Sequence, residues 1–129
     1  MQKDFWAWHK YKNKLNDNKE RLNFNEKEVW FAAVGMNIGF EQNGKGLESL
    51  RPIIVLKKFN NGILWAVPTT SKYRDGKYYF RFQQRKGSFS TAILSQIRLI
   101  DSKRLDHRIG YINEKDFIEI KERIISLLR

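Results

Sequence analysis

The sequence contains no cysteine among its 129 residues. This absence excludes disulfides, thiolate-bound zinc and a cysteine nucleophile, and the composition gives no argument for an oxidising compartment. Apolar runs stay far below the roughly 20 residues that are needed to span a bilayer, and the N-terminus has no signal-peptide core. We therefore expect a soluble, unexported protein of the cytoplasm.

Imidazoles and phosphate-binding loops are also scarce. Only His9 and His107 are present, and neither lies in a spacing that is typical of metal ligands, such as two histidines one helical turn apart. Gly44 and Gly46 flank Lys45, but this loop lacks the spacing and the following hydroxyl of a nucleotide-binding P-loop. The sequence therefore predicts no zinc site and no nucleotide-binding loop.

Acidic residues are outnumbered by basic ones, 14 to 25, which gives a formal net charge of +11. The excess is concentrated between Arg51 and Arg108, where 13 Lys or Arg stand against three Asp, a net charge of +10. Such a concentration attracts polyanions and raises their encounter rate. It indicates either a binding surface for nucleic acid or an acidic protein, or a solvated surface that keeps the protein soluble.

Apolar material is sufficient for one continuous core, because 41% of the residues are hydrophobic and 14% are aromatic. Periodicity predicts an amphipathic helix over residues 2–17, a connecting loop over 16–27, and a C-terminal helix that begins after Asn113 as N-cap. Asn60, Asn61 and Gly62 predict a β-hairpin turn, and Pro68 is expected to end or bend the strand that follows. Strands are predicted over residues 29–34, 52–56, 63–67, 77–82 and 91–94.

These elements predict an α+β fold in which a small curled antiparallel β-barrel carries a helix at each end. We expect residues 1–27 to form the N-terminal helix and its connecting loop, and residues 28–129 to form the barrel domain. We expect a single globular domain overall.

Three local features carry chemistry: Arg51 with Pro52 at a strand start, the Pro68, Thr69 and Thr70 run at a strand end, and the Ser95 to Arg98 stretch after another strand. An arginine that opens an apolar strand either lies on the surface or binds an anion such as phosphate. The paired threonines are either ordinary turn residues or ligand contacts.

In order and spacing, four segments resemble the MazF/PemK toxin family: IGFEQ at 38–42, RPIIVL at 51–56, VPTT at 67–70 and AILSQIRLID at 92–101, followed by Arg104 and Leu105. The resemblance covers roughly residues 29–128. It implies the SH3-like fold of the MazF, PemK and CcdB plasmid toxins. It also implies the toxin of a type II toxin-antitoxin system, a sequence-specific endoribonuclease that cleaves single-stranded RNA without metal or cofactor.

In that family the 2′-hydroxyl of one nucleotide attacks its own 3′-phosphate, which leaves a 2′,3′-cyclic phosphate and a free 5′-hydroxyl. The partners implied are RNA, an acidic antitoxin protein and a second copy of the chain in a homodimer, with no membrane. Two rival functions stay open, namely a gyrase poison of the same fold and a non-catalytic nucleic-acid-binding module.

Residue by residue, the resemblance makes Arg51 the catalytic arginine and Thr70 the catalytic threonine, with Thr69 in its place if the alignment slips by one position. Glu41 matches an acidic residue of the family and is either a general base or the partner of a structural salt bridge. Many members carry an acid where Ser95 stands.

The remaining assignments come from charge, order and loop position. Lys72, Lys77 and Arg81 are expected to contact RNA phosphates, and Lys45 and Thr69 are also expected to bind RNA. Gln96 and Arg98 are expected to hold loop and interface geometry.

Overall fold

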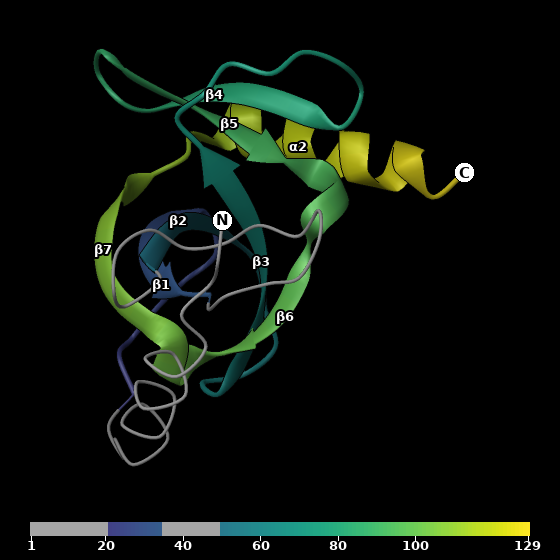
Figure 1. Ribbon diagram of the computed structural model, residues 1–129. Coiled ribbons are helices and arrows are strands. Elements are labelled where there is room, and N and C mark those ends of the chain that lie inside the picture. Colours follow the sequence, from purple (N-terminus) through teal and green to yellow (C-terminus); the bar gives the residue numbers. More distant parts are fainter. Residues whose placement is uncertain (1–20, 35–49) are drawn as a thin grey trace, which may run out of the picture.

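The computed structural model describes residues 21–34 and 50–129 (Figure 1). The predicted N-terminal helix, Glu41 and Lys45 lie outside these ranges. The strands, the two short 3-10 helices η1 and η2, and the α-helix follow in this order: β1 Glu28–Ala33, β2 Leu50–Lys58, β3 Ile63–Thr70, β4 Tyr79–Arg85, β5 Ser88–Ile93, η1 Leu94–Gln96, β6 Arg98–Asp101, η2 Ser102–Arg104, β7 Leu105–Tyr111 and α2 Glu114–Leu127.

The strands form one antiparallel sheet in the order β4-β5-β3-β2-β1-β7, with β6 also paired to β3. The predicted β2–β3 hairpin is confirmed. Its turn is held by the side-chain oxygen of Asn60, which accepts hydrogen bonds from the amides of Gly62 and Ile63 at 2.7 and 3.0 Å. Pro68 does not end the second strand, because β3 continues to Thr70 and Pro68 pairs with Ile53.

The central strands are apolar at successive positions because both faces of the sheet are covered. In β2, Ile53 and Val55 lie in one core cluster with Trp30, whereas Ile54 lies in a second cluster with Phe117 of α2. Side chains of a strand alternate between its two faces, so a strand that is buried on both sides shows no polar alternation. Figure 1 shows α2 lying beside β4 and β5.

The C-terminal helix begins as predicted. The side-chain oxygen of Asn113 accepts a hydrogen bond from the amide of Asp116 at 2.8 Å, which satisfies one of the unpaired donors of the first turn. Phe117 and Ile120 are buried against the sheet. Among the described residues, no helix is long and apolar enough to span a membrane.

Two strands were not predicted. β6 has only four residues, and β7 contains the exposed residues Asp106, His107 and Arg108. An edge strand with polar side chains lacks the apolar pattern from which a strand is predicted. The position of β7 is set by its pairing with β1, about 80 residues earlier in the chain.

The predicted curled antiparallel sheet is confirmed, but its closure into a barrel is not. In the described part of the chain the sheet curls but its end strands, β4 and β7, are not hydrogen-bonded neighbours. The edge of β3 that faces away from β2 pairs with two strands. Ile63 to Ala66 pair with β6, and Thr69 and Thr70 pair with β5. The two ends still touch at Gly110 of β7, where a Cβ atom would stand 3.0 Å from the backbone oxygen of Gln84 in β4. Glycine permits this close approach.

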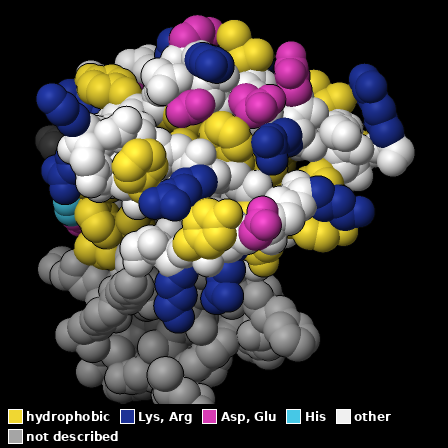
Figure 2. All heavy atoms as spheres, turned by 90° about the horizontal axis from the view of Figure 1, so that it is seen from above, with side chains coloured by type: hydrophobic (Ala, Val, Ile, Leu, Met, Phe, Trp, Pro, Cys, Tyr) yellow, Lys and Arg dark blue, Asp and Glu magenta, His cyan; other side chains and the backbone are white. Residues whose placement is uncertain are grey.

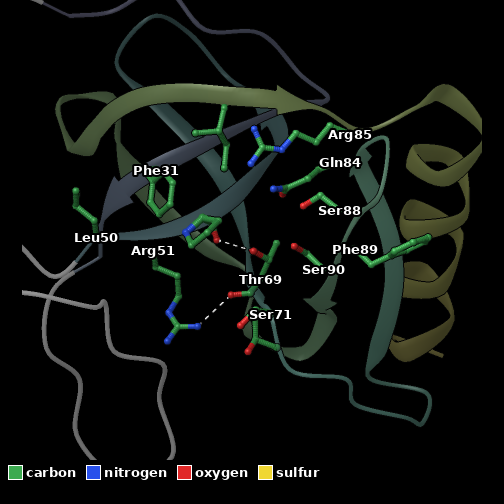
Figure 3. A pocket seen from close by; sticks show the side chains of 13 residues that line it. Phe31, Leu50, Arg51, Thr69, Ser71, Gln84, Arg85, Ser88, Phe89 and Ser90 are labelled. Carbon is green, nitrogen blue, oxygen red and sulfur yellow. Dashed lines mark hydrogen bonds between the residues drawn. The ribbon is translucent and has the colours of Figure 1, made fainter.

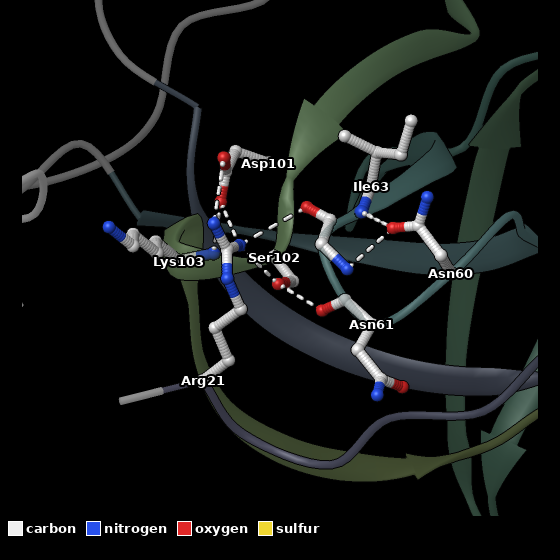
Figure 4. A network of polar contacts seen from close by, with 8 residues as sticks. Arg21, Asn60, Asn61, Ile63, Asp101, Ser102 and Lys103 are labelled. Carbon is white, nitrogen blue, oxygen red and sulfur yellow. Dashed lines mark hydrogen bonds and ion pairs between the residues drawn. The ribbon is translucent and has the colours of Figure 1, made fainter. Parts of the chain in front are cut away.

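Arg21 attaches the segment before β1 to the β2–β3 turn and to the junction of β6 and η2 (Figure 4). Its guanidinium forms an ion pair with Asp101 and donates to the hydroxyl of Ser102 at 2.8 Å and to the carbonyl of Gly62 at 3.2 Å. The Ser102 hydroxyl in turn donates to the carbonyl of Asn61 at 2.7 Å. This network fixes the hairpin turn against η2.

Asp101 is expected to make stability depend on pH. Desolvation acts to raise the pKa of its carboxyl, but hydrogen bonds from Arg21 and the Lys103 amide outweigh it and hold the pKa below its ordinary value of 3.8. A depressed pKa contributes stability that is complete above the ordinary value and is lost as pH falls through the folded value. Because the pair is partly exposed, Asp101→Asn should cost about 0.5 kcal/mol at pH 7 and less below pH 3.8.

Urea unfolding at several pH values measures this difference. Asp75→Asn is the matched control, since Asp75 lies in an exposed turn and its side chain bonds only the neighbouring Gly76 amide in the described structure. Equal free energies of unfolding for the wild type and Asp101→Asn at neutral pH would contradict the prediction.

Candidate active site

A hollow of about 350 Å³ opens where β2 begins and β3 ends (Figure 3). Antiparallel pairing brings these two points together, because the hairpin turn is at the other end of both strands. The β4–β5 hairpin forms the opposite wall, since β5 pairs with Thr69 and Thr70. The residues that line the hollow are Phe31, Leu50, Arg51, Pro52, Thr69, Thr70, Ser71, Gln84, Arg85, Ser88, Phe89, Ser90 and Ile109.

Arg51 is buried, with only 9% of its surface exposed, although it lines the hollow. Its guanidinium donates a hydrogen bond to the carbonyl of Thr69 at 3.0 Å, which sets the direction of the side chain across the hairpin. Burial lowers the pKa of this guanidinium, but an arginine stays protonated at neutral pH. A cation that is partly removed from water attracts an anion more strongly than one on the surface.

Thr69 and Thr70 differ in what their hydroxyls do. Thr69 is fully buried, and its hydroxyl donates to the carbonyl of Pro52 at 3.0 Å. Thr70 is half-buried, and its hydroxyl oxygen accepts a hydrogen bond from the Lys72 amide at 3.3 Å. Within the described residues the hydroxyl proton of Thr70 has no acceptor, so it can serve a ligand. The geometry therefore favours Thr70 over Thr69 as a ligand contact.

The hollow carries positive charge and many hydroxyl groups. Two guanidinium groups, those of Arg51 and Arg85, lie in its lining together with five hydroxyl side chains and the Gln84 amide, and no carboxylate belongs to the described lining. Within the described residues, the buried side-chain oxygen of Gln84 has no hydrogen-bond partner. Donors without competing acids are suited to a phosphate oxygen.

The predicted RNA contacts are dispersed. Lys72 is exposed just after β3, beside Thr70. Lys77 lines a different hollow with Arg123 and the end of α2, so it does not face Arg51. Arg81 lies on the exposed face of β4. Glu41 and Lys45 lie outside the described residues.

The stretch after β5 supports the end of β1. Arg98 donates to the carbonyl of Val34 at 3.1 Å, and Arg104 donates to the carbonyl of Ala33 at 3.0 Å. Gln96 ends η1, and Ser95 is exposed there. Burial lowers the pKa of Arg104, and Arg98 lowers it further by charge repulsion.

Sequence reasoning did not assign Arg85, Gln84 or the serines of the β4–β5 hairpin to the site. Arg85 was counted only as one more charge in the basic stretch. The available signal was the turn at Lys86 and Gly87, because a tight hairpin places the residues on both sides of it together.

Comparison with known structures defines the fold. The chain is similar to MazF from Deinococcus radiodurans in crystal form I, with a TM-score of 0.69 and 21% identity over 81% of this chain and 96% of that chain. Mycobacterium tuberculosis toxin MazF-mt6 gives a TM-score of 0.60 and 14% identity over 78% and 95% of the two chains.

A mycobacterial endoribonuclease in complex with its cognate antitoxin gives a TM-score of 0.62 and 11% identity over 82% and 95% of the two chains. No curated protein shows significant sequence similarity to the chain. The curled antiparallel sheet and C-terminal helix of this chain therefore have a MazF-like fold.

The family follows from the sequence match. The model of the PemK-like, MazF-like toxin of type II toxin-antitoxin systems matches residues 26–128. The chain belongs to this toxin family, which confirms the resemblance that its four segments indicated.

Proposed function

We propose that the protein is an endoribonuclease toxin that cleaves single-stranded RNA in the hollow between β2, β3 and the β4–β5 hairpin, without metal. The observation that carries this proposal is the composition of the lining, which holds two guanidinium groups and five hydroxyl side chains and no carboxylate among the described residues. Membership of the toxin family supports it. An endoribonuclease also stands among the similar structures.

The reaction asks little covalent chemistry of the protein. The 2′-oxygen of one nucleotide forms a bond to the adjacent phosphorus while the bond from phosphorus to the 5′-oxygen breaks, so the substrate supplies the nucleophile. The proton of the 2′-hydroxyl passes to a base, and the leaving 5′-oxygen takes one up. The protein must hold the attacking and leaving oxygens in line and stabilise the charge on the phosphoryl oxygens.

Arg51 and Thr70 fit these tasks. The fork of a guanidinium binds two phosphoryl oxygens at once, and the anchored Arg51 is already oriented by its bond to Thr69. We expect the Thr70 hydroxyl to donate to the scissile phosphate or to the 2′-oxygen. Glu41 remains the proposed general base on the strength of the family resemblance, and Lys45 and Lys72 remain proposed phosphate contacts.

We propose an acidic antitoxin and a second copy of the chain as protein partners. The net charge of +11 suits an acidic partner, and a similar structure holds an endoribonuclease with its cognate antitoxin. The cytoplasm, where messenger RNA and such an antitoxin meet, is the proposed location.

Cleavage of a long RNA by the purified protein, beside DNA of the same sequence, tests the function. The wild type should cut RNA into discrete fragments and leave DNA intact, because DNA lacks the 2′-hydroxyl. Thr70→Val should lose about 100-fold in rate and Thr70→Ser should retain most of it, as expected for one transition-state hydrogen bond.

Thr69→Val is the matched control, since its buried hydroxyl serves the hairpin. It should lower stability by about 1 kcal/mol and leave cleavage within a few-fold. Intact RNA combined with inhibition of gyrase supercoiling would replace the nuclease with a gyrase poison. Intact RNA with tight RNA binding alone would leave a binding module.

A further inference from the structure

Two exposed aromatic rings flank one arginine on the outer face of β4 and β5. The guanidinium carbon of Arg81 lies 4.8 Å from the centre of the Phe89 ring and 5.4 Å from the centre of the Tyr73 ring. Tyr73 is 64% exposed and Phe89 is 50% exposed. Contiguous exposed apolar surface marks interaction sites, whereas single exposed rings are normal, and here two exposed rings share one cation.

We call Tyr73, Arg81 and Phe89 the stacking platform. It comes from three separate elements, namely the segment after β3, strand β4 and strand β5. Cation–π contact with both rings keeps the Arg81 side chain against the sheet. The three groups therefore offer planar faces at positions fixed by the fold.

The platform is continuous with the candidate active site. Phe89 is part of the lining of the hollow, and Ser71, two residues before Tyr73, belongs to the same lining. In Figure 3 the Phe89 side chain points away from Arg51 and Thr69, toward the side of the view on which α2 is drawn. A strand whose phosphate lies at Arg51 and Thr70 can leave the hollow across Phe89.

The charge around the platform is strongly positive. Residues 71–90 contain six Lys or Arg and a single Asp, a net charge of +5. Within the described residues none of these six forms an ion pair with a carboxylate. Figure 2 looks down on this part of the molecule from above and shows basic, hydrophobic and acidic side chains together on this face.

We infer that the stacking platform binds an unpaired base of the RNA strand next to the scissile phosphate. Aromatic faces interleaved with cations are the combination by which proteins hold single-stranded nucleic acid, because every base has a π-face and every nucleotide a charge. The inference rests on the proposed function, since it takes RNA as the occupant of the hollow. It adds a contact that holds the base, whereas Arg51 and Thr70 hold the phosphate.

Binding of a fluorescein-labelled, short single-stranded DNA of mixed sequence, followed by anisotropy, tests the platform without cleavage. Tyr73→Ala and Phe89→Ala should each weaken binding by about tenfold, since one base stack contributes about 1–3 kcal/mol. Phe89→Leu should be as weak as Phe89→Ala, and Phe89→Trp should bind like the wild type. A strand of the same length made of abasic nucleotides should bind the wild type and Phe89→Ala equally.

Phe59→Ala is the control, because Phe59 is 45% exposed and lies at the hairpin end of β2, away from the hollow. It should bind DNA like the wild type. Unchanged DNA binding by Tyr73→Ala and Phe89→Ala overturns the inference, and so does full affinity in Phe89→Leu. If Tyr73→Ala and Phe89→Ala weaken the binding of poly-glutamate but leave DNA binding unchanged, the surface binds an acidic protein instead. Because DNA is not cleaved, a platform effect without RNA cleavage would retain base binding by the platform and reject the nuclease together with its scissile phosphate.

Discussion

Arg51→Lys should lower kcat/KM for RNA cleavage by about 100- to 1,000-fold, which is the usual cost of removing one preorganised donor to a developing oxyanion. Lysine keeps the positive charge but loses the planar fork that contacts two phosphoryl oxygens. It also loses the arginine geometry that bonds the Thr69 carbonyl at 3.0 Å and fixes the side chain in the wall of the hollow. The loss should fall mainly on kcat, because the charge on these oxygens grows in the transition state.

Arg104→Lys is the matched control for this prediction. Arg104 is likewise desolvated and donates to a strand carbonyl, that of Ala33, but it does not line the hollow. It should lower the melting temperature as much as Arg51→Lys does and keep kcat/KM within a few-fold of the wild type. Equal losses of activity in the two variants would assign Arg51 a purely structural role.

Glu28→Ala should lower the free energy of unfolding by about 3 kcal/mol, the range expected when one partner of a buried network is removed. Glu28 is only 4% exposed. Its carboxylate accepts hydrogen bonds from the Trp30 indole at 2.9 Å and the Asn25 amide at 2.8 Å, and it pairs with Arg108 at 3.1 Å. The Glu28→Ala substitution leaves the indole N–H of Trp30 inside the core without this acceptor.

Chemical denaturation measures this effect beside two other variants. Glu28→Gln keeps an acceptor for the indole and should lose about 1 kcal/mol. Glu119→Ala removes an exposed partner of Arg123, 3.7 Å away on the same helix, and should change stability by less than about 0.5 kcal/mol. A loss below 1 kcal/mol in Glu28→Ala would show that Glu28 does not organise the start of β1.

Local patterns predicted those parts of the fold that are stabilised locally. The Asn60 turn and the Asn113 cap each depend on a side chain bonding amides within three residues, so both could be recognised in sequence. β7 could not be predicted, because its exposed polar side chains are compatible with a strand only once β1 supplies the pairing. Closure into a barrel was wrong for the same reason, since it depends on distant edges meeting.

The candidate site divides in a similar way. Arg51 and Thr70 were selected by resemblance, and the hairpin register explains why residues 19 positions apart line one hollow. Arg85 and Phe89 reach the same hollow only through the pairing of β5 with the last residues of β3. The turn at Lys86 and Gly87 predicts that Arg85 lies beside Ser88, but not that this hairpin lies beside the end of β3, because that contact depends on two strands that are separate in sequence.

The most direct test of the account is the chemistry of the cut ends after wild-type protein has acted on a long RNA in excess EDTA. The account predicts fragments that carry a 2′,3′-cyclic phosphate and a 5′-hydroxyl, formed at the same sites and rate as without the chelator. Cleavage that EDTA abolishes would contradict metal independence. Ends that carry a 5′-phosphate would contradict attack by the neighbouring 2′-hydroxyl, because that product requires another nucleophile and departure of the 3′-oxygen.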